Sequence, residues 1–123
     1  MIDYAEAQAA CETYIRSLQA SDVETLLALF DDNASIEDPV GTALREGKSA
    51  LREFYSVACE GVLSAALSGA PRLAGNEVAF PFTVTAGTVG EELTINIIDV
   101  FKFNEAGKVV SMRAFWGPNK IGS

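Results

Sequence analysis

The sequence contains no histidine, and this absence excludes several common kinds of site. Without histidine the chain cannot build a Ser-His-Asp or Cys-His catalytic arrangement, and the usual histidine-containing zinc sites are excluded too. Acid–base chemistry must therefore use Asp, Glu, Tyr, Lys or Cys. The chain has two cysteines, Cys11 and Cys59, which lie in no metal-binding or redox motif. We expect both to be small buried or half-buried thiols.

Positive charge is also scarce. Nine Lys and Arg residues face seventeen Asp and Glu residues, and the net charge of −8 argues against a nucleic-acid partner. No stretch approaches the roughly 20 apolar residues of a membrane span. The opening stretch MIDYAEAQAACETY has no basic region followed by an apolar run. We therefore expect no signal peptide and a cytoplasmic location.

Apolar residues are plentiful, at 49% of 123 residues, so the chain can bury a core as a single domain over 1–123. Helical spacing predicts a helix from about 3 to 20. The stretch SDVE matches a capping box and predicts a second helix from Ser21 that carries Leu26, Leu27, Leu29 and Phe30 inward. A short extended piece is expected at 35–37, and a third helix from Lys48 to about Cys59.

The second half of the chain alternates with a period of two, which is typical of strands. We expect a weak strand at 63–68 and clear strands at 78–86, 93–103 and 109–116, with NEAGK forming a hairpin turn. Pro81 should lie at an edge or a bulge, because proline cannot donate to a ladder. Helices followed by antiparallel strands predict an α+β fold, in which a curved, mostly antiparallel sheet wraps the helices as a cone with an apolar mouth.

Two polar residues stand on apolar faces. Tyr14 lies on the buried stripe of the first helix, where an unsatisfied phenol would cost about 1–3 kcal/mol, and a bond to a carbonyl is the simplest reading. Asp99 shares the apolar register of LTINIIDVFKF. It needs a cation, many donors or a proton. Arg113 has the parity opposite to Met112 and should point away, so protonation is one answer; a bulge or a structural hydrogen bond is another.

A third polar residue, Asp38, precedes a proline in IEDPVG, where aspartates are usually turn residues. Glu37 and Asp38 point in opposite directions if the chain is extended, so only one of them can face a cavity. Taken together, Tyr14 and Asp99 are two neutral donors that could hold a developing oxyanion, and Asp38 is a carboxylate that could move a proton. This combination fits proton abstraction next to a ketone in an apolar pocket.

The sequence resembles the bacterial Δ5-3-ketosteroid isomerases along essentially its whole length. The matching stretches are YI at Tyr14, ASIEDPVG at Asp38, REFY ending at Tyr55, and IIDVFKFNEAGKVVSMRAFWG around Asp99. This family is the familiar example of a carboxylic acid kept neutral so that it can donate a hydrogen bond. The resemblance implies the cone-shaped fold of nuclear transport factor 2-like proteins and a homodimer formed through the sheet.

The resemblance also implies a mechanism. The steroid 3-keto oxygen would bind between Tyr14 and protonated Asp99, while Asp38 moves a proton from C4 to C6 without cofactor or metal. Tyr55 would orient Tyr14, and Trp116 could place its indole N–H near Asp38. Some relatives have a tyrosine at the position of Phe30, so the tyrosine network should be shorter here. Trp116 is also a candidate for the apolar wall, together with Leu18, Phe54, Phe82, Val84, Ile95, Ile97, Phe101 and Met112.

Two other classes of function remain open for this fold. A non-catalytic binder of apolar ligands would have no use for Asp38 opposite two donors. Another enzyme, such as a polyketide cyclase or an epoxide hydrolase, is the second alternative. An epoxide hydrolase of this fold is expected to need an Asp-Arg-Asp set, and no arginine stands at a strand position expected to face the pocket.

Overall fold

The computed structural model describes residues 1–117. These residues form three helices: α1 (Tyr4–Ala20), α2 (Val23–Leu27) and α3 (Lys48–Glu60). They also form seven strands: β1 (Phe30–Glu37), β2 (Arg45–Glu46), β3 (Val62–Leu67), β4 (Arg72–Ala74), β5 (Glu77–Thr88), β6 (Glu91–Phe103) and β7 (Val109–Phe115).

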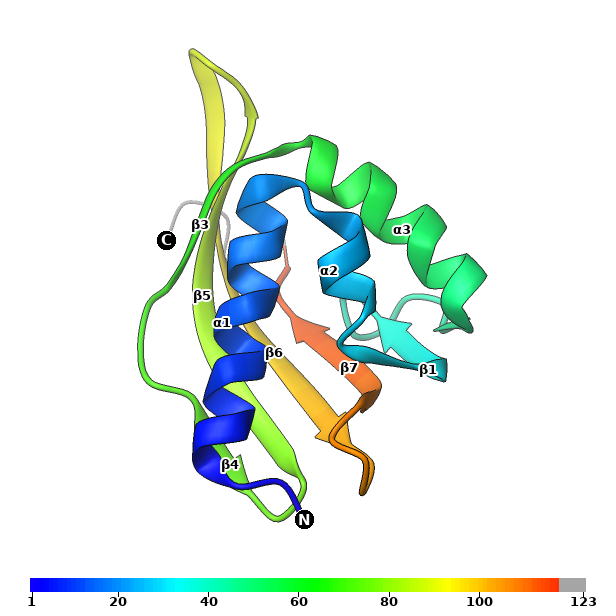
Figure 1. Ribbon diagram of the computed structural model, residues 1–123. Coiled ribbons are helices and arrows are strands. Elements are labelled where there is room, and N and C mark those ends of the chain that lie inside the picture. Colours follow the sequence, from blue (N-terminus) through cyan, green and yellow to red (C-terminus); the bar gives the residue numbers. More distant parts are fainter. Residues whose placement is uncertain (118–123) are drawn as a thin grey trace.

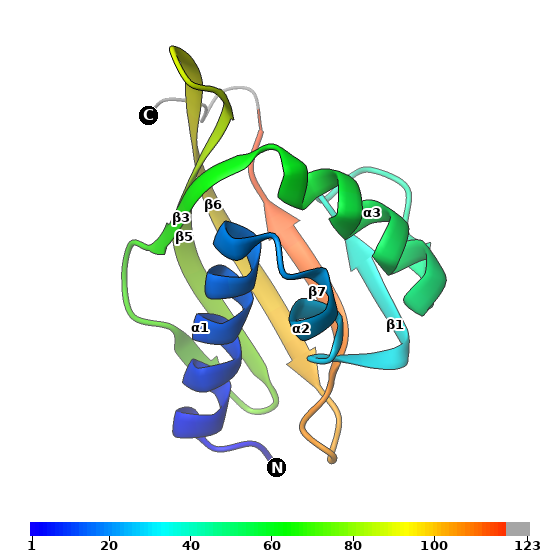
Figure 2. The ribbon, with the colours of Figure 1, turned by 45° about the horizontal axis from the view of Figure 1, so that its top comes forward.

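All seven strands belong to one curved sheet. The strand order is β2-β1-β7-β6-β5-β3, and β4 pairs with the first part of β5. Among the described strands, only β1 and β7 run parallel to each other; the other pairs are antiparallel. Figure 1 shows the three helices on one face of this sheet, and they stay on that face in the turned view of Figure 2. The predicted α+β class and mostly antiparallel sheet are confirmed.

The pairing of β5 with β6 decides which side chains face the helices. The two strands pair without interruption from Glu77 opposite Lys102 to Thr88 opposite Glu91. Phe80 therefore lies directly opposite Asp99, and Ala114 of β7 lies on the other side of Asp99. Because side chains alternate along a strand, the even positions of β5 and the odd positions of β6 share the concave face that the helices cover.

Helix α1 ends, and α2 begins, at adjacent capping residues. Asp3 caps α1 in a capping box with Glu6, and Ser21 ends α1 in the left-handed conformation. Asp22, not Ser21, caps α2, since its side chain accepts a hydrogen bond from the backbone N–H of Thr25. The prediction that SDVE is a capping box starting at Ser21 was therefore wrong by one residue. Ser21 is used elsewhere: its hydroxyl donates to the carbonyl of Cys59 at 3.1 Å.

Phe30 corrects a second prediction. We expected it to extend the second helix, but α2 ends at Leu27 and Phe30 opens β1, paired with Val109. The backbone N–H of Val109 also donates to the carbonyl of Leu29 at 2.9 Å, so pairing with β7 overrides the local helical pattern. Phe30 still faces the core, with 2% of its surface exposed. The short extended piece expected at 35–37 is the end of this longer strand.

The remaining departures lie at strand ends. Leu93 has the parity of the buried residues but is 55% exposed, because β5 and β6 extend beyond the helices there (Figure 1). At the start of β7 a register shift buries Val109, where Val110 was expected. Pro81 lies on β5 between the segments paired with β3 and β4, and its carbonyl accepts a hydrogen bond from the N–H of Ser68. The missing proline N–H therefore interrupts no ladder.

Phe101 lies at the centre of the aromatic core. Its ring centroid is 4.8 Å from that of Phe80 and 5.1 Å from that of Tyr14, and the side chain is fully buried. We predict that Phe101→Ala lowers the free energy of unfolding by about 3–5 kcal/mol, through lost apolar burial and the cavity left behind. Urea denaturation measures this. Val57→Ala is the control, because Val57 is 69% exposed, and it should change stability by less than about 0.5 kcal/mol.

Candidate active site

A cavity of about 230 Å³ lies between α1, α3 and the concave face of β5 and β6. Its wall is mainly apolar, and the polar side chains that reach it are those of Tyr14, Asp38, Tyr55, Asp99 and Trp116. These five residues come from α1, from the loop after β1, from α3, from β6 and from the end of β7. The sheet and its covering helices thus bring together residues that are up to 102 positions apart in the sequence.

Tyr14 and Tyr55 form a hydrogen-bonded pair in the wall. Their hydroxyl oxygens are 2.9 Å apart, and both side chains are buried. The Tyr14 hydroxyl is therefore hydrogen-bonded to another phenol and not to a carbonyl, which was the simplest interpretation of the sequence. Burial raises the pKa of both tyrosines well above the usual value, and the neighbouring Asp99 acts in the same direction. Both hydroxyls therefore carry their protons at neutral pH.

Asp99 is buried on the central strand β6, with 1% of its surface exposed. This burial shows that no bulge has turned the side chain to the surface. Within the described residues its Oδ1 atom has no hydrogen-bond partner. Burial raises the pKa of Asp99 well above the usual value; the negative charge of Asp38 adds to this rise, and the Tyr14 hydroxyl opposes it. A protonated Asp99 is a hydrogen-bond donor that faces the cavity.

Asp38 reaches the cavity from the loop that follows β1. Its Oδ1 accepts a hydrogen bond of 2.7 Å from the indole N–H of Trp116. Burial raises the pKa of Asp38, while the Trp116 hydrogen bond and the positive charge of Arg45 lower it. The two cavity aspartates therefore differ in kind: Asp38 has a donor and a cation to favour its ionised form, whereas Asp99 is enclosed by apolar side chains.

Neighbouring contacts fix the direction of Asp38. Glu37 points the other way, accepting hydrogen bonds from Arg113 at 3.1 Å and from the backbone N–H of Gly41. The backbone N–H of Val40 donates to the carbonyl of Ala114 at 2.8 Å, which ties the loop to β7. Arg113 is exposed and directed away from Asp99. The opposite directions expected for Glu37 and Asp38, and for Met112 and Arg113, therefore agree with the structure.

Seven of the nine wall candidates line the cavity: Leu18, Phe54, Phe82, Val84, Ile95, Ile97 and Trp116. Phe101 and Met112 do not; both are fully buried in the core beneath it. The period of two identifies the concave face, but it cannot say where along a strand the helices stop covering that face. Four lining residues were missed, Ala58, Gly61, Val62 and Ala86, because small residues and a helix-to-strand junction carry no pattern that marks them.

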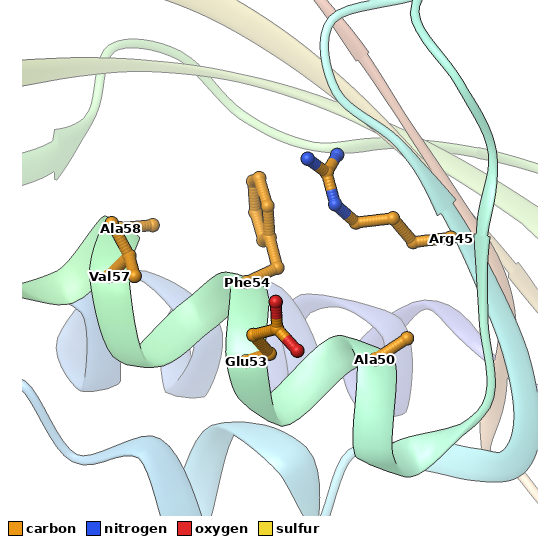
Figure 3. Close-up of a pocket in the computed structure, with 6 residues that line it drawn as sticks. All are labelled: Arg45, Ala50, Glu53, Phe54, Val57 and Ala58. Atoms are coloured by element: carbon orange, nitrogen blue, oxygen red, sulfur yellow. The ribbon is translucent and has the colours of Figure 1, made fainter.

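A second pocket, of about 480 Å³, adjoins the cavity on the outer side of α3. Figure 3 shows its six lining residues, which include Arg45, Glu53 and Val57. Phe54 and Ala58 line both spaces. The guanidinium carbon of Arg45 lies 4.8 Å from the centroid of the Phe54 ring. Sequence reasoning missed Arg45, because strand β2 has only two residues and shows no alternation.

Phe30 packs beside the tyrosine pair, with its ring centroid 5.9 Å from that of Tyr55. A phenylalanine has no hydroxyl to offer. Within the described residues, the hydrogen bonding of the two phenols therefore consists of the single Tyr14–Tyr55 contact.

These features define the chain as an NTF2-like α+β protein whose cavity holds two buried tyrosine hydroxyls and two carboxyl groups in different surroundings. The SnoaL-like domain family matches residues 11–112, and the chain belongs to this family. A steroid Delta-isomerase of Nocardioides simplex is 35% identical over 117 residues, covering 95% of this chain and 94% of that protein. The expected resemblance to the ketosteroid isomerases is therefore confirmed.

Other relatives on this fold have a different chemistry. The epoxide hydrolase LasB of Streptomyces lasalocidi is 32% identical over 110 residues, which are 85% of this chain but only 39% of LasB. A solved structure of the epoxide hydrolase/cyclase-like enzyme SalBIII superposes with a TM-score of 0.89 at 31% identity, covering 99% of this chain and 98% of that one. SalBIII is described as acting in pyran ring formation in the polyether salinomycin. All three relatives are enzymes.

Within residues 1–117, none of the helices is long and apolar enough to cross a membrane, and no three Cys, Asp or Glu side chains group as a metal site.

The protonation of Asp99 can be tested directly. We predict that the carboxyl carbon of Asp99, observed by NMR in protein labelled at aspartate, keeps the protonated chemical shift well above the pH at which an ordinary aspartate ionises, near pH 3.9. Asp99→Asn identifies the signal by its loss. Asp22 is the internal control, because its hydrogen bonds to Thr25 lower its pKa. Ionisation of Asp99 at or below the ordinary value of about pH 3.9 would contradict the prediction.

The raised pKa of Asp99 also makes the stability of the folded protein depend on pH. The pKa of Asp99 is raised in the folded protein, so its contribution to stability is complete below the unfolded pKa and is lost as the pH rises through the folded pKa.

Proposed function

We propose that the protein is a cofactor-independent steroid Delta-isomerase that converts Δ5-3-ketosteroids into conjugated Δ4-3-ketosteroids. The observation that carries the proposal is the buried Asp99, whose Oδ1 has no partner among the described residues and which shares one cavity with Tyr14 and Asp38. A buried polar atom without a partner is costly, and a substrate oxygen bound there would supply one. The similarity to the Nocardioides simplex isomerase supports the same activity.

In the first step the 3-keto oxygen accepts hydrogen bonds from the Tyr14 hydroxyl and the Asp99 carboxylic acid. Ionised Asp38 removes a proton from C4, and the electron pair of the broken C–H bond moves towards the keto oxygen to form a dienolate. The two neutral donors stabilise the oxyanion as its charge develops, in a cavity where apolar walls strengthen such bonds.

In the second step protonated Asp38 returns the proton to C6, and the electron pair moves back to restore the ketone. One carboxylate thus acts first as base and then as acid, and no atom is gained or lost. The raised pKa of Asp38 suits this double role, because a base closer to neutrality also becomes a better acid once protonated.

Two further residues have supporting roles in this mechanism. The two hydroxyl oxygens are 2.9 Å apart. The mechanism assigns the donor role in this bond to Tyr55, so that the Tyr14 proton is directed at the substrate. Trp116 holds Asp38 through its indole N–H and contributes to the cavity wall. Phe30, which packs beside Tyr55, has no hydroxyl with which to extend this hydrogen-bonded pair.

A second candidate function is the opening of an epoxide by an internal hydroxyl group, favoured by the similarity to LasB and SalBIII. Asp38 would take the proton of the attacking hydroxyl, and Asp99 would give its proton to the epoxide oxygen. Arg45 lies in the outer pocket and not in the wall of the inner cavity, so the cavity wall does not contain the expected Asp-Arg-Asp set. We therefore place this function second.

We further propose that two copies of the chain associate through the helix-free face of the sheet. Pro81, Ile98 and Phe115 are neighbours across β5, β6 and β7 on that face. Ile98 is 48% and Phe115 42% exposed, and a shallow apolar depression of about 530 Å³ lies around them. Adjacent exposed apolar side chains of this kind mark a protein interface.

The decisive assay of the proposed isomerase follows ultraviolet absorbance on mixing with a Δ5-3-ketosteroid, because the conjugated product absorbs strongly. We predict that Asp38→Asn lowers turnover by several orders of magnitude, since the base is lost. Tyr14→Phe should raise the barrier by about 2–4 kcal/mol, because one oxyanion donor is lost. Circular dichroism should show that both variants are folded.

The controls separate the three classes of function. Val89→Ala, in the exposed turn between β5 and β6, should keep wild-type turnover. Absence of any absorbance change with wild-type protein would overturn the isomerase. Turnover of a hydroxy-epoxide in its place would support the second candidate, and ligand binding without either reaction would favour a binding protein. If Asp38→Asn kept full activity, the isomerase reaction would stand, but the proposed role of Asp38 as the base would be disproved.

The proposed dimer has its own test. Sedimentation velocity should give about twice the chain mass of 13.1 kDa, and Ile98→Asp should give the monomer, because a charge would be buried in the apolar contact. Val57→Asp adds the same charge on the opposite side of the molecule and should remain dimeric. A wild-type protein that sediments as a monomer at all concentrations would refute the proposal.

A further inference from the structure

Arg45 differs from the two cations that follow it in the chain. Lys48 pairs with Asp32 at 3.7 Å, and Arg52 pairs with Glu24. Within residues 1–117, no carboxylate lies within ion-pair distance of Arg45.

What Arg45 does contact is the ring face of Phe54, at 4.8 Å from its guanidinium carbon to the ring centroid. Stacking on an aromatic ring leaves the edge of a guanidinium free, and that edge carries its hydrogen-bond donors. Arg45 is thus a fixed, exposed cation with unused donors.

The sheet register explains why this cation stands at the cavity entrance. Arg45 pairs with Ile36 across β2 and β1, and Ile36 is fully buried on the concave face. Residues directly opposite each other in an antiparallel pair point to the same side of the sheet. Arg45 therefore reaches from the sheet edge over the concave face towards α3, and Figure 3 shows its guanidinium facing the ring of Phe54.

The inner cavity is too small for a whole steroid. Its volume of about 230 Å³ is below the roughly 300–1,000 Å³ of sites that enclose a drug-sized ligand. If the ketone binds at Tyr14 and Asp99, the far end of a four-ring skeleton must leave the cavity. Phe54 and Ala58 line both the inner cavity and the outer pocket, so the path past them leads to Arg45.

We propose that the preferred substrate carries a carboxylate at the end remote from its ketone, and that Arg45 binds this carboxylate in the outer pocket. The inference rests on the proposed isomerase function and narrows its substrate class. The outer pocket offers Ala50, Val57 and Ala58 to an apolar side chain and the planar guanidinium to two carboxylate oxygens.

Two electrostatic features of the protein oppose the binding of a carboxylate in the outer pocket. Glu53 lines the same pocket, and the chain as a whole carries a net charge of −8. Both would repel an anionic substrate. A preference for the carboxylate over an equally large neutral ligand therefore requires a local cation and cannot come from the overall field of the protein.

The experiment compares two Δ5-3-ketosteroids that differ only at the far side chain, one with a free carboxylate and one with its methyl ester. For wild-type protein we expect kcat/KM to be roughly two- to fivefold higher for the carboxylate, as a single rim ion pair allows, with the difference in KM. The preference should weaken as salt is added. Quenching of Trp116, the single tryptophan, measures binding of both compounds independently of turnover.

Variants assign the preference to a residue. Arg45→Gln should bring the carboxylate-to-ester ratio of kcat/KM to one or below, while Arg45→Lys should keep part of it. Glu53→Gln should raise the ratio. Arg72→Gln makes the same change in net charge on β4, where Arg72 contacts the carbonyl of Ala70, and it should leave the ratio as in wild type.

The outcomes separate the two proposals. Turnover of the ester with no preference for the carboxylate, or a preference that Arg45→Gln does not reduce, would overturn the role of Arg45 and leave the isomerase standing. If neither compound is converted, the isomerase proposal fails and the substrate assignment fails with it, whatever the tryptophan signal shows.

Discussion

The structure of the site depends on the enclosure of one carboxyl group. Asp99 lies on the central strand, between Phe80 of β5 and Ala114 of β7, and the helices cover the face onto which it points. An ionised carboxylate in that position would lose most of its solvation without a cation to replace it. The apolar surroundings therefore hold the proton on Asp99, and an ordinary acceptor becomes a donor.

Two aspartates in one cavity are separated by their surroundings. Asp38 is at the end of a strand, where a loop, an indole N–H and a nearby cation favour its charge. Asp99 has apolar neighbours on both adjacent strands, and the charge of Asp38 makes its own ionisation still less favourable. The negative charge on one aspartate thus helps to keep the other neutral, which is the division of labour that an acid–base site requires.

The relatives show how little of the fold is tied to one reaction. An isomerase and two epoxide hydrolase or cyclase enzymes share this architecture at 31–35% identity. In this chain the cavity wall includes the small residues Ala58, Gly61 and Ala86, and the adjoining outer pocket holds the cation Arg45. We propose that the choice of substrate depends on these positions.

The sequence by itself determined the fold class, the concave face of β5 and β6, and the unusual place of Asp99 in an apolar register. These features follow from the alternation of side chains with a period of two along the strands. Local signals failed in two places. Phe30 joined a strand because β7 pairs with it, and Asp22 caps α2 because Ser21 already ends α1 in the left-handed conformation. Only the tertiary structure decided that Phe101 and Met112 lie beneath the cavity, and that Arg45 reaches its entrance. Those positions depend on where helices end over the sheet and on the register of a two-residue strand, and neither is encoded in a local pattern.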